Sequence, residues 1–171
     1  MQVVKKIFFS LVVLWIAILF FMPKQMLYYK LEEVLAKNDI KINETRIEEG
    51  LFSLKVYDSK IFVKGIELAS VKKIDFFTLL FYTNVNIKDL ELDSSLQNKA
   101  PTQMDTSSVT YALWNPINLS IDAQGPFGGI DGTVALMNRS LRLDFNETTQ
   151  IQMLKANLKQ DEKGWFYETT F

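Results

Sequence analysis

Paired carboxylates are the side chains of this chain that could carry out acid–base chemistry. The pairs lie at Glu32-Glu33, Glu48-Glu49 and Asp161-Glu162. Two carboxyl groups hydrolyse a glycosidic bond when they face each other across a cleft, about 5–10 Å apart. Adjacent residues of a strand point to opposite faces, so no single pair forms such a site. We therefore interpret these carboxylates as solvated charges at turns and on helix surfaces.

Histidine and cysteine are both absent from the 171 residues. Without histidine there is no imidazole base and no Ser-His-Asp triad, and without cysteine there is no thiolate nucleophile or disulfide. The glycine-rich segment 125–129 lacks a following Lys-Ser/Thr and precedes a strand pattern, which indicates a turn and not a phosphate-binding loop. We expect a chain that is not an enzyme and that binds no metal or cofactor.

The charge of the chain bears on its partners. The formal net charge is −1, and outside the N-terminal segment the densest basic cluster is the pair Lys72-Lys73. Binding to nucleic acid needs clustered Lys and Arg side chains that neutralise phosphates. We therefore expect no direct contact with nucleic acid.

Four Asn-x-Ser/Thr triplets begin at Asn43, Asn118, Asn138 and Asn146. Such triplets arise often by chance. Asn146 differs because Asp144 stands two residues before it, which resembles the extended acceptor of some bacterial glycosylation systems. Asn146 is therefore the candidate glycosylation site, and a cap-forming turn is the alternative interpretation.

An almost unbroken apolar run occupies residues 7–22, after Lys5 and Lys6. At about 1.5 Å per residue it reaches roughly 24 Å, and residues 3–4 lengthen it if the two lysines extend to the interface. We predict a single-span transmembrane anchor, with its flanks, over residues 1–27. Its lipid-facing candidates are Ile7, Phe8, Leu11, Leu14, Trp15, Leu19 and Phe20.

A cleaved secretory signal is the rival interpretation of this run. Signal cores end at small residues, whereas this run ends in Phe-Phe-Met-Pro-Lys, which favours an uncleaved anchor. Lys5 and Lys6 favour a cytoplasmic N-terminus, although Lys24 and Lys30 on the other flank weaken the bias. We expect a bacterial inner-membrane protein whose C-terminal domain lies in the periplasm.

A juxtamembrane helix is predicted over residues 28–39, within a helical pattern that starts at Lys24. Leu27, Leu31, Val34 and Leu35 form one apolar stripe. The stripe packs on the domain of the chain itself or, alternatively, on a helix of a partner.

From residue 40 the apolar period changes to two, which predicts antiparallel strands over 40–171. A turn is expected at Asp58-Ser59, a loop or linker over 94–108 between two pieces of the domain, and a helix over 148–158. Segment 75–82 is either a short amphipathic helix or a buried strand. The fold class is mainly β: an antiparallel, curved or partly open sheet with one or two short helices and an N-terminal transmembrane helix.

The apolar face of this sheet suggests a groove for lipid, with a simple hydrophobic core as the alternative. The candidate groove residues are Phe52, Leu54, Val56, Ile61, Val63, Phe77, Leu80 and Phe81, with Phe76 and Leu79 beside them.

Two segments resemble the AsmA-like envelope proteins and their relative, the N component of type II secretion systems. Residues 69–92 are similar to the strand, leucine-rich segment and returning I-x-x-L-x-L strand of that family, and residues 129–136 to its glycine-spaced strand. The resemblance implies a periplasmic β domain that serves a secretion, pilus or DNA-uptake machine, or that handles lipid along an apolar groove. This chain is far shorter than the large lipid-transfer members that bridge two membranes.

Our first functional hypothesis is a non-catalytic, membrane-anchored component of a bacterial envelope assembly that acts through protein–protein contacts. The alternative is a lipid-binding or lipid-transfer domain that holds phospholipid in an apolar groove. A hydrolase that uses carboxylates alone is the third class.

Overall fold

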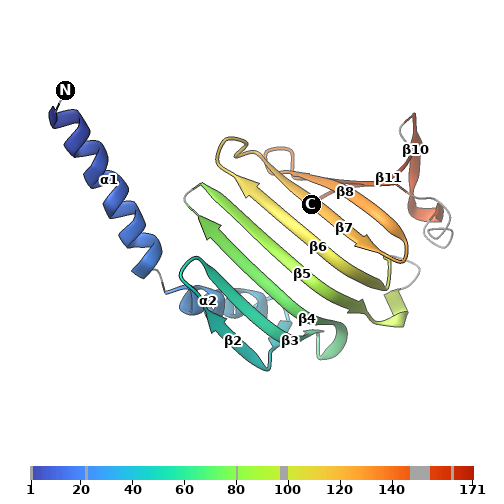
Figure 1. Cartoon of the computed structure of the whole chain (residues 1–171). Helices are drawn as coiled ribbons and strands as arrows, with labels where there is room; N and C mark the ends of the chain where they lie inside the picture. Colours follow the sequence, from blue (N-terminus) through green and yellow to red (C-terminus); the bar gives the residue numbers. More distant parts are fainter. Residues whose placement is uncertain (1, 22, 80, 97–99, 147–154, 163) are drawn as a thin grey trace.

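One curved antiparallel sheet and two α-helices make up the described part of the chain (Figure 1). The computed structural model describes residues 2–21, 23–79, 81–96, 100–146, 155–162 and 164–171. The expected mainly-β fold with an antiparallel open sheet is confirmed. Strand order follows chain order from β3 to β9, so consecutive strands there are antiparallel neighbours.

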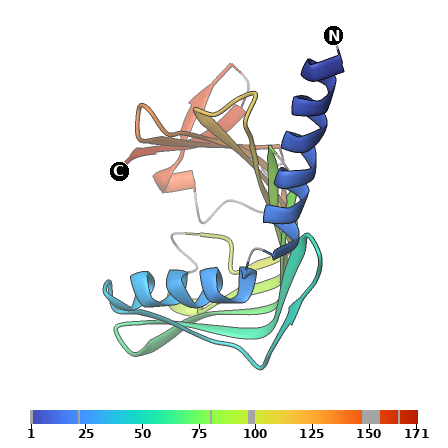
Figure 2. The same ribbon diagram turned by 90° about the vertical axis from the view of Figure 1, so that its left-hand side faces the viewer.

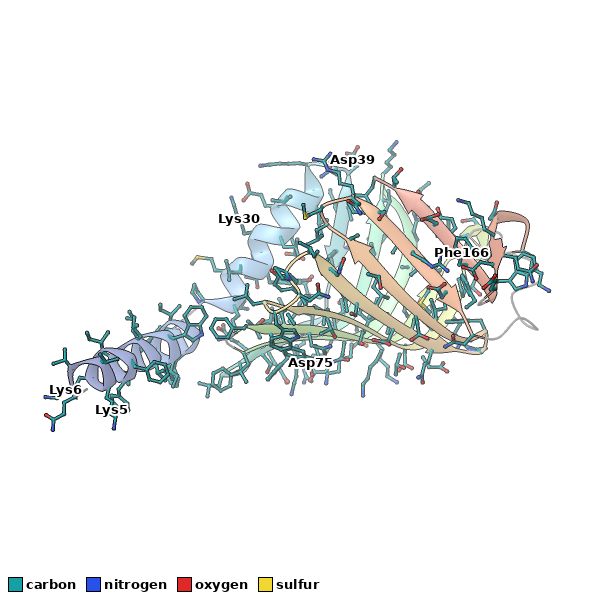
Figure 3. All side chains as sticks on the ribbon, turned by 90° about the horizontal axis from the view of Figure 1, so that it is seen from above. Lys5, Lys6, Lys30, Asp39, Asp75 and Phe166 are labelled. Carbon is teal, nitrogen blue, oxygen red and sulfur yellow. The ribbon has the colours of Figure 1, made fainter. Side chains whose placement is uncertain are left out.

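The helices α1 (Gln2–Phe21) and α2 (Lys24–Ala36) precede the sheet. Pro23 separates them, since proline has no amide hydrogen and cannot continue a helix. The large apolar side chains of α1 are exposed, and Lys5 and Lys6 lie on the part of α1 away from the sheet (Figure 3). Among the residues that the structure describes, no helix has both the length and the apolarity needed to cross a membrane.

Eleven strands are hydrogen-bonded in the order β1-β3-β4-β5-β6-β7-β8-β9-β11-β10, with β2 paired to β3. Their bounds are β1 Ile40–Asn43, β2 Arg46–Glu49, β3 Ser53–Val63, β4 Ile66–Leu79, β5 Tyr82–Leu92, β6 Gln103–Ala112, β7 Asn118–Gly125, β8 Gly128–Ala135, β9 Ser140–Phe145, β10 Lys159–Asp161 and β11 Gly164–Thr170. Two single turns of 3-10 helix, Ser94–Leu96 and Lys155–Asn157, lie in the connections.

The sheet curves strongly, and α2 lies inside the curve (Figure 2). Asp58 in β3, Lys72 in β4 and Asp89 in β5 lie on one line across the sheet where regular pairing is interrupted. Asp58 and Asp89 both have a φ of 50°, and Lys72 Nζ lies 3.5 Å from Asp89 Oδ2. The interruption continues to Asp105 in β6. An interruption of the ladder at the same level in four neighbouring strands bends a sheet as β-bulges do.

Several local predictions differ from the structure. Asp58-Ser59 is not a turn, because β3 continues through it with the local bend described above. β6 begins at Gln103, inside the expected linker 94–108, and pairs with β5, so both pieces belong to one sheet. The Ser and Thr residues that suggested a loop are compatible with a paired strand.

Two further expectations concern ambiguous or short segments. Segment 75–82 is strand up to Leu79, but it is not the single buried strand of the second interpretation, because Asp75–Thr78 are half-buried, Leu79 is exposed and Tyr82 begins β5. The strand β2 was not predicted, because its four residues RIEE show no alternation of apolar and polar side chains. The helix expected over 148–158 lies mostly outside the described residues.

Candidate functional site

The concave face of the sheet carries two continuous rows of side chains, fixed by the strand register. One row runs through Leu54, Phe76, Val85, Val109, Ile121, Gly132, Leu143 and Tyr167. The next runs through Val56, Ile74, Ile87, Ser107, Ala123, Ile130, Phe145 and Trp165. Nearly all of these side chains are apolar, so the face is apolar from β3 to β11.

Helix α2 covers the first part of this face. It packs on β1, β2 and β3, and Tyr28 joins a core cluster with Val71 and Ile74. Leu54 and Val56 are 4% and 0% exposed beneath it. These side chains therefore form hydrophobic core and not an open groove.

A small apolar pocket remains where α2 begins. Its volume is about 200 Å³. Its walls come from the first turns of α2 and from β3 and β4, through Lys24, Leu27, Tyr28, Leu31, Phe52, Leu54, Phe76 and Thr78. Pockets for complete small molecules measure about 300–1,000 Å³, so this one has room only for part of an apolar chain.

We call the half-buried part of the concave face of β6–β9 the open half. Its side chains are only half-buried, in contrast to those beneath α2; they are Val109, Tyr111, Leu119, Ile121, Val134, Leu141 and Leu143. A second core cluster of Ala123, Phe127, Ile130 and Phe145 closes the far side of this half. Among the residues that the structure describes, the open half is therefore a partly exposed apolar surface.

Gly132 lies at the centre of the open half. An added Cβ would lie 2.5 Å from Leu143 Cδ2 and 3.2 Å from Ile121 Cβ. Because glycine has no side chain, the concave surface is recessed at the middle of the first row, between the side chains of Ile121 and Leu143.

The structure distributes the predicted groove residues over different surroundings. Ile61 packs against the α2 core, Phe52 lines the small pocket, and Val63 is half-buried at the end of β3. Leu79 is exposed at the end of β4, and Leu80 lies outside the described residues.

Phe77 and Phe81 do not belong to a groove with these residues. Phe77 lies on the opposite face with Ser53 and Asn84, because neighbouring residues of β4 alternate between faces. Phe81 lies exposed in the connection between β4 and β5, and its ring centroid is 5.4 Å from that of Trp15.

The predicted anchor residues all lie on α1. Those whose side chains are described are exposed: Ile7, Phe8, Leu11, Leu14, Trp15 and Phe20. The side chain of Leu19 is not among those that the structure describes.

The open half was missed by sequence reasoning. The alternation in segments 117–121 and 130–137 places these residues on one face of a sheet but does not indicate what covers that face. Sequence patterns locate the apolar face of a strand, whereas its covering depends on where α2 packs.

A small carboxylate cluster lies between α2 and the sheet. Burial, and next the nearby carboxylate of Glu44, raise the pKa of Glu32 above its usual value, while the Tyr28 hydroxyl acts in the opposite direction. Burial and the charge of Glu32 also raise the pKa of Tyr28. Burial on α2 therefore favours the neutral form of Glu32 more than exposure to water would.

The other paired carboxylates take part in ion pairs and hydrogen bonds. Tyr57 donates a hydrogen bond of 3.0 Å to Glu48, and Lys24 Nζ lies 3.8 Å from Glu49. On the convex face Arg142 Nη2 donates to Asp161 Oδ2 at 2.6 Å. These contacts support the interpretation of the paired carboxylates as structural surface charges.

Asn146 follows the last residue of β9 and is exposed. Its side-chain amide donates a hydrogen bond of 2.7 Å to Asp131 Oδ2, and its backbone N–H donates to Gly129. The remainder of its triplet lies outside the described residues.

Comparison with models of protein families, with characterised proteins and with solved structures finds no match for this chain. Within the described part of the chain, no three acidic side chains gather in a way that could hold a metal ion. The apolar concave face and the exposed apolar surface of α1 are the features of the described residues that bear on function.

Proposed function

We propose that this chain is a non-catalytic, membrane-anchored protein that binds lipid acyl chains on the open half of its curved sheet. The observation that carries the proposal is the half-exposed apolar surface that includes Val109 and Ile121. Covering such surface contributes about 25 cal/mol per Å². An acyl chain matches this surface because it is apolar along its length and needs no hydrogen-bond partner.

The anchor in this proposal is the apolar run of residues 7–22, most of which forms α1, with residues 3–4 lengthening it. Exposed apolar side chains all around a helix are favourable in lipid and costly in water. Lys5 and Lys6 lie on the part of α1 away from the sheet, as expected for a cytoplasmic N-terminus (Figure 3). The sheet then lies on the periplasmic side of a bacterial inner membrane.

Protease accessibility tests this location. Protease added to spheroplasts should digest the sheet domain, while intact cells should protect it. Digestion only after the inner membrane is permeabilised would contradict a periplasmic sheet.

Co-purified lipid tests the binding function. The full chain, purified in mild detergent, should carry phospholipid that mass spectrometry detects, and Ile121→Asp should lose most of it. The matched control is Ser120→Asp, because Ser120 is the exposed neighbour on the convex face of the same strand. Circular dichroism of both variants checks that the sheet is intact.

Equal lipid content in the Ile121→Asp and Ser120→Asp variants would contradict binding on the open half. Absence of phospholipid from the unmodified chain would contradict the function itself.

A protein-binding role in an envelope assembly is the second candidate. It is favoured by α2, which shows that an amphipathic helix fits inside the curve of this sheet. A helix of a partner protein could cover the open half in the same way. Co-purification of one stoichiometric partner, lost in Ile121→Asp but kept in Ser120→Asp, would favour this role over lipid binding.

A further inference from the structure

The two ends of the sheet differ in the side chains of their connections. The end near α1, which we call the proximal end, carries the connections β4–β5, β6–β7 and β8–β9 (Figure 1). Each of these connections exposes large apolar side chains: Phe81, Leu113, Trp114, Ile117, Leu136 and Met137. Trp114 and Met137 are the most exposed of them, at 75% and 77%.

Among the residues that the structure describes, the connections at the opposite, distal end are polar by comparison. Its connections expose Lys64, Ser95 and Glu162, and Phe127 in the β7–β8 turn folds inward to a 6% exposed position. Ile66 is the large exposed apolar side chain among the described residues at this end. The two ends of the sheet therefore differ in how much apolar surface their connections expose.

The proximal connections form a continuous surface that reaches α1. Leu113 N–H donates to Phe81 O, Leu136 N–H donates to Ile117 O, and the rings of Tyr82 and Trp114 stack with centroids 6.3 Å apart. The Phe81 ring lies against Trp15 of α1. The apolar surface of the connections is thus continuous with the apolar surface of the helix.

We propose that the proximal end of the sheet rests on the lipid bilayer, with Trp114 and Met137 in the headgroup and upper acyl region. This inference rests on the proposed anchor, because α1 brings this end to the membrane. Exposed apolar patches mark interaction surfaces, and tryptophan in particular suits the membrane interface. The open half then begins at the bilayer surface, where an acyl chain can enter it.

The three tryptophans of the chain provide a built-in test, because Trp15, Trp114 and Trp165 lie in α1, at the proximal end and at the distal end respectively. Three full-chain variants each keep one tryptophan and replace the other two by phenylalanine. Each is reconstituted in phosphatidylcholine vesicles whose acyl chains carry bromine near the headgroup or near the chain end. We expect deep bromines to quench Trp15, shallow bromines to quench Trp114, and neither to quench Trp165.

Quenching of Trp15 without quenching of Trp114 would overturn this inference and leave the anchor in place. Failure to quench Trp15 would contradict the anchor itself. Equal quenching of Trp114 and Trp165 would overturn the end-on orientation. Met137→Asp should reduce the quenching of Trp114, whereas Ile66→Asp at the distal end should not.

Discussion

Glu32 is the residue whose ionisation is most closely linked to the packing of α2. It is half-buried, whereas Glu33 beside it is exposed and forms an ion pair of 2.6 Å with Lys30. The pKa of Glu32 is raised, chiefly by burial, and the pKa of Glu33 is lowered, chiefly by its hydrogen bond to Lys30. The two neighbours should therefore affect stability with opposite dependence on pH.

Glu32→Gln should stabilise the full chain at pH 7, and the gain should shrink as the pH falls through the usual range of a glutamate. Because its pKa is raised, Glu32 keeps its proton to a higher pH in the folded state than in the unfolded state. The free energy of unfolding of the unmodified chain therefore falls as the pH rises from the unfolded pKa through the folded pKa. Denaturant unfolding in detergent, followed by circular dichroism at several pH values, measures this effect.

Glu33→Gln is the matched control for this experiment. Because the pKa of Glu33 is lowered, its contribution is present at neutral pH and is lost as the pH falls through the folded pKa. If Glu32→Gln raised the free energy of unfolding by the same amount at every pH, that result would contradict a pKa of Glu32 raised by burial.

Leu54 is the side chain whose truncation should most weaken the packing between α2 and the sheet. It is 4% exposed, and Leu54→Ala should lower the free energy of unfolding by about 2–5 kcal/mol through lost burial and a residual cavity. The control Leu51→Ala removes the same atoms at an exposed position before β3 and should change stability by less than about 0.5 kcal/mol. Similar effects of the two variants would contradict the coverage of Leu54 by α2.

At the scale of elements, Arg142 connects the last three strands on the convex face. Its guanidinium donates to Asp144 on β9 and Asp161 on β10, and its Cζ lies 4.1 Å from the centre of the Phe166 ring on β11. These carboxylates raise the pKa of Arg142 through their hydrogen bonds. A planar guanidinium can make all of these contacts at once, whereas an ammonium group cannot.

Arg142→Lys should therefore release β10 while leaving β3 to β8 intact. We expect faster amide hydrogen exchange in Lys159–Asp161, and unchanged exchange in Ser53–Val63. Lys159→Arg, which keeps the charge beside Glu168, is the control. Unchanged exchange in β10 after Arg142→Lys would show that the edge strand does not depend on this cluster.

The elements that could be predicted from the sequence are those with a strong local pattern. Period-two alternation in 85–92, 117–121 and 141–145 predicted strands that the structure contains, and the helical pattern from Lys24 predicted α2. The expected packing of the apolar stripe on the sheet was wrong, because Leu27, Leu31 and Val34 are exposed and α2 buries Tyr28 instead. The bend at Asp58 and Asp89 could not be predicted, because it depends on four strands losing regular pairing at the same level. β2 and the start of β6 lack apolar alternation and are defined by pairing with their neighbours.

At the scale of the whole molecule, the curved sheet divides its apolar face into a part covered by α2 and an open half (Figure 2). The sequence pattern indicated an apolar face, and we expected the groove on the segment that forms β3 and β4. In the structure α2 covers Leu54 and Val56 of this segment. The position of a covering helix results from tertiary packing, which local patterns do not encode. In our account the open half is available to lipid because the proximal end brings it to the bilayer.

Site-specific photocrosslinking tests this central claim most directly. A benzophenone amino acid placed at Tyr111, on the concave face of the open half, is activated in membranes that contain the full chain. The same amino acid at Ser120, on the convex face, serves as the control. We predict a phospholipid adduct at position 111 and none at position 120. Absence of a lipid adduct at 111, or equal adducts at both positions, would contradict acyl-chain binding on the open half.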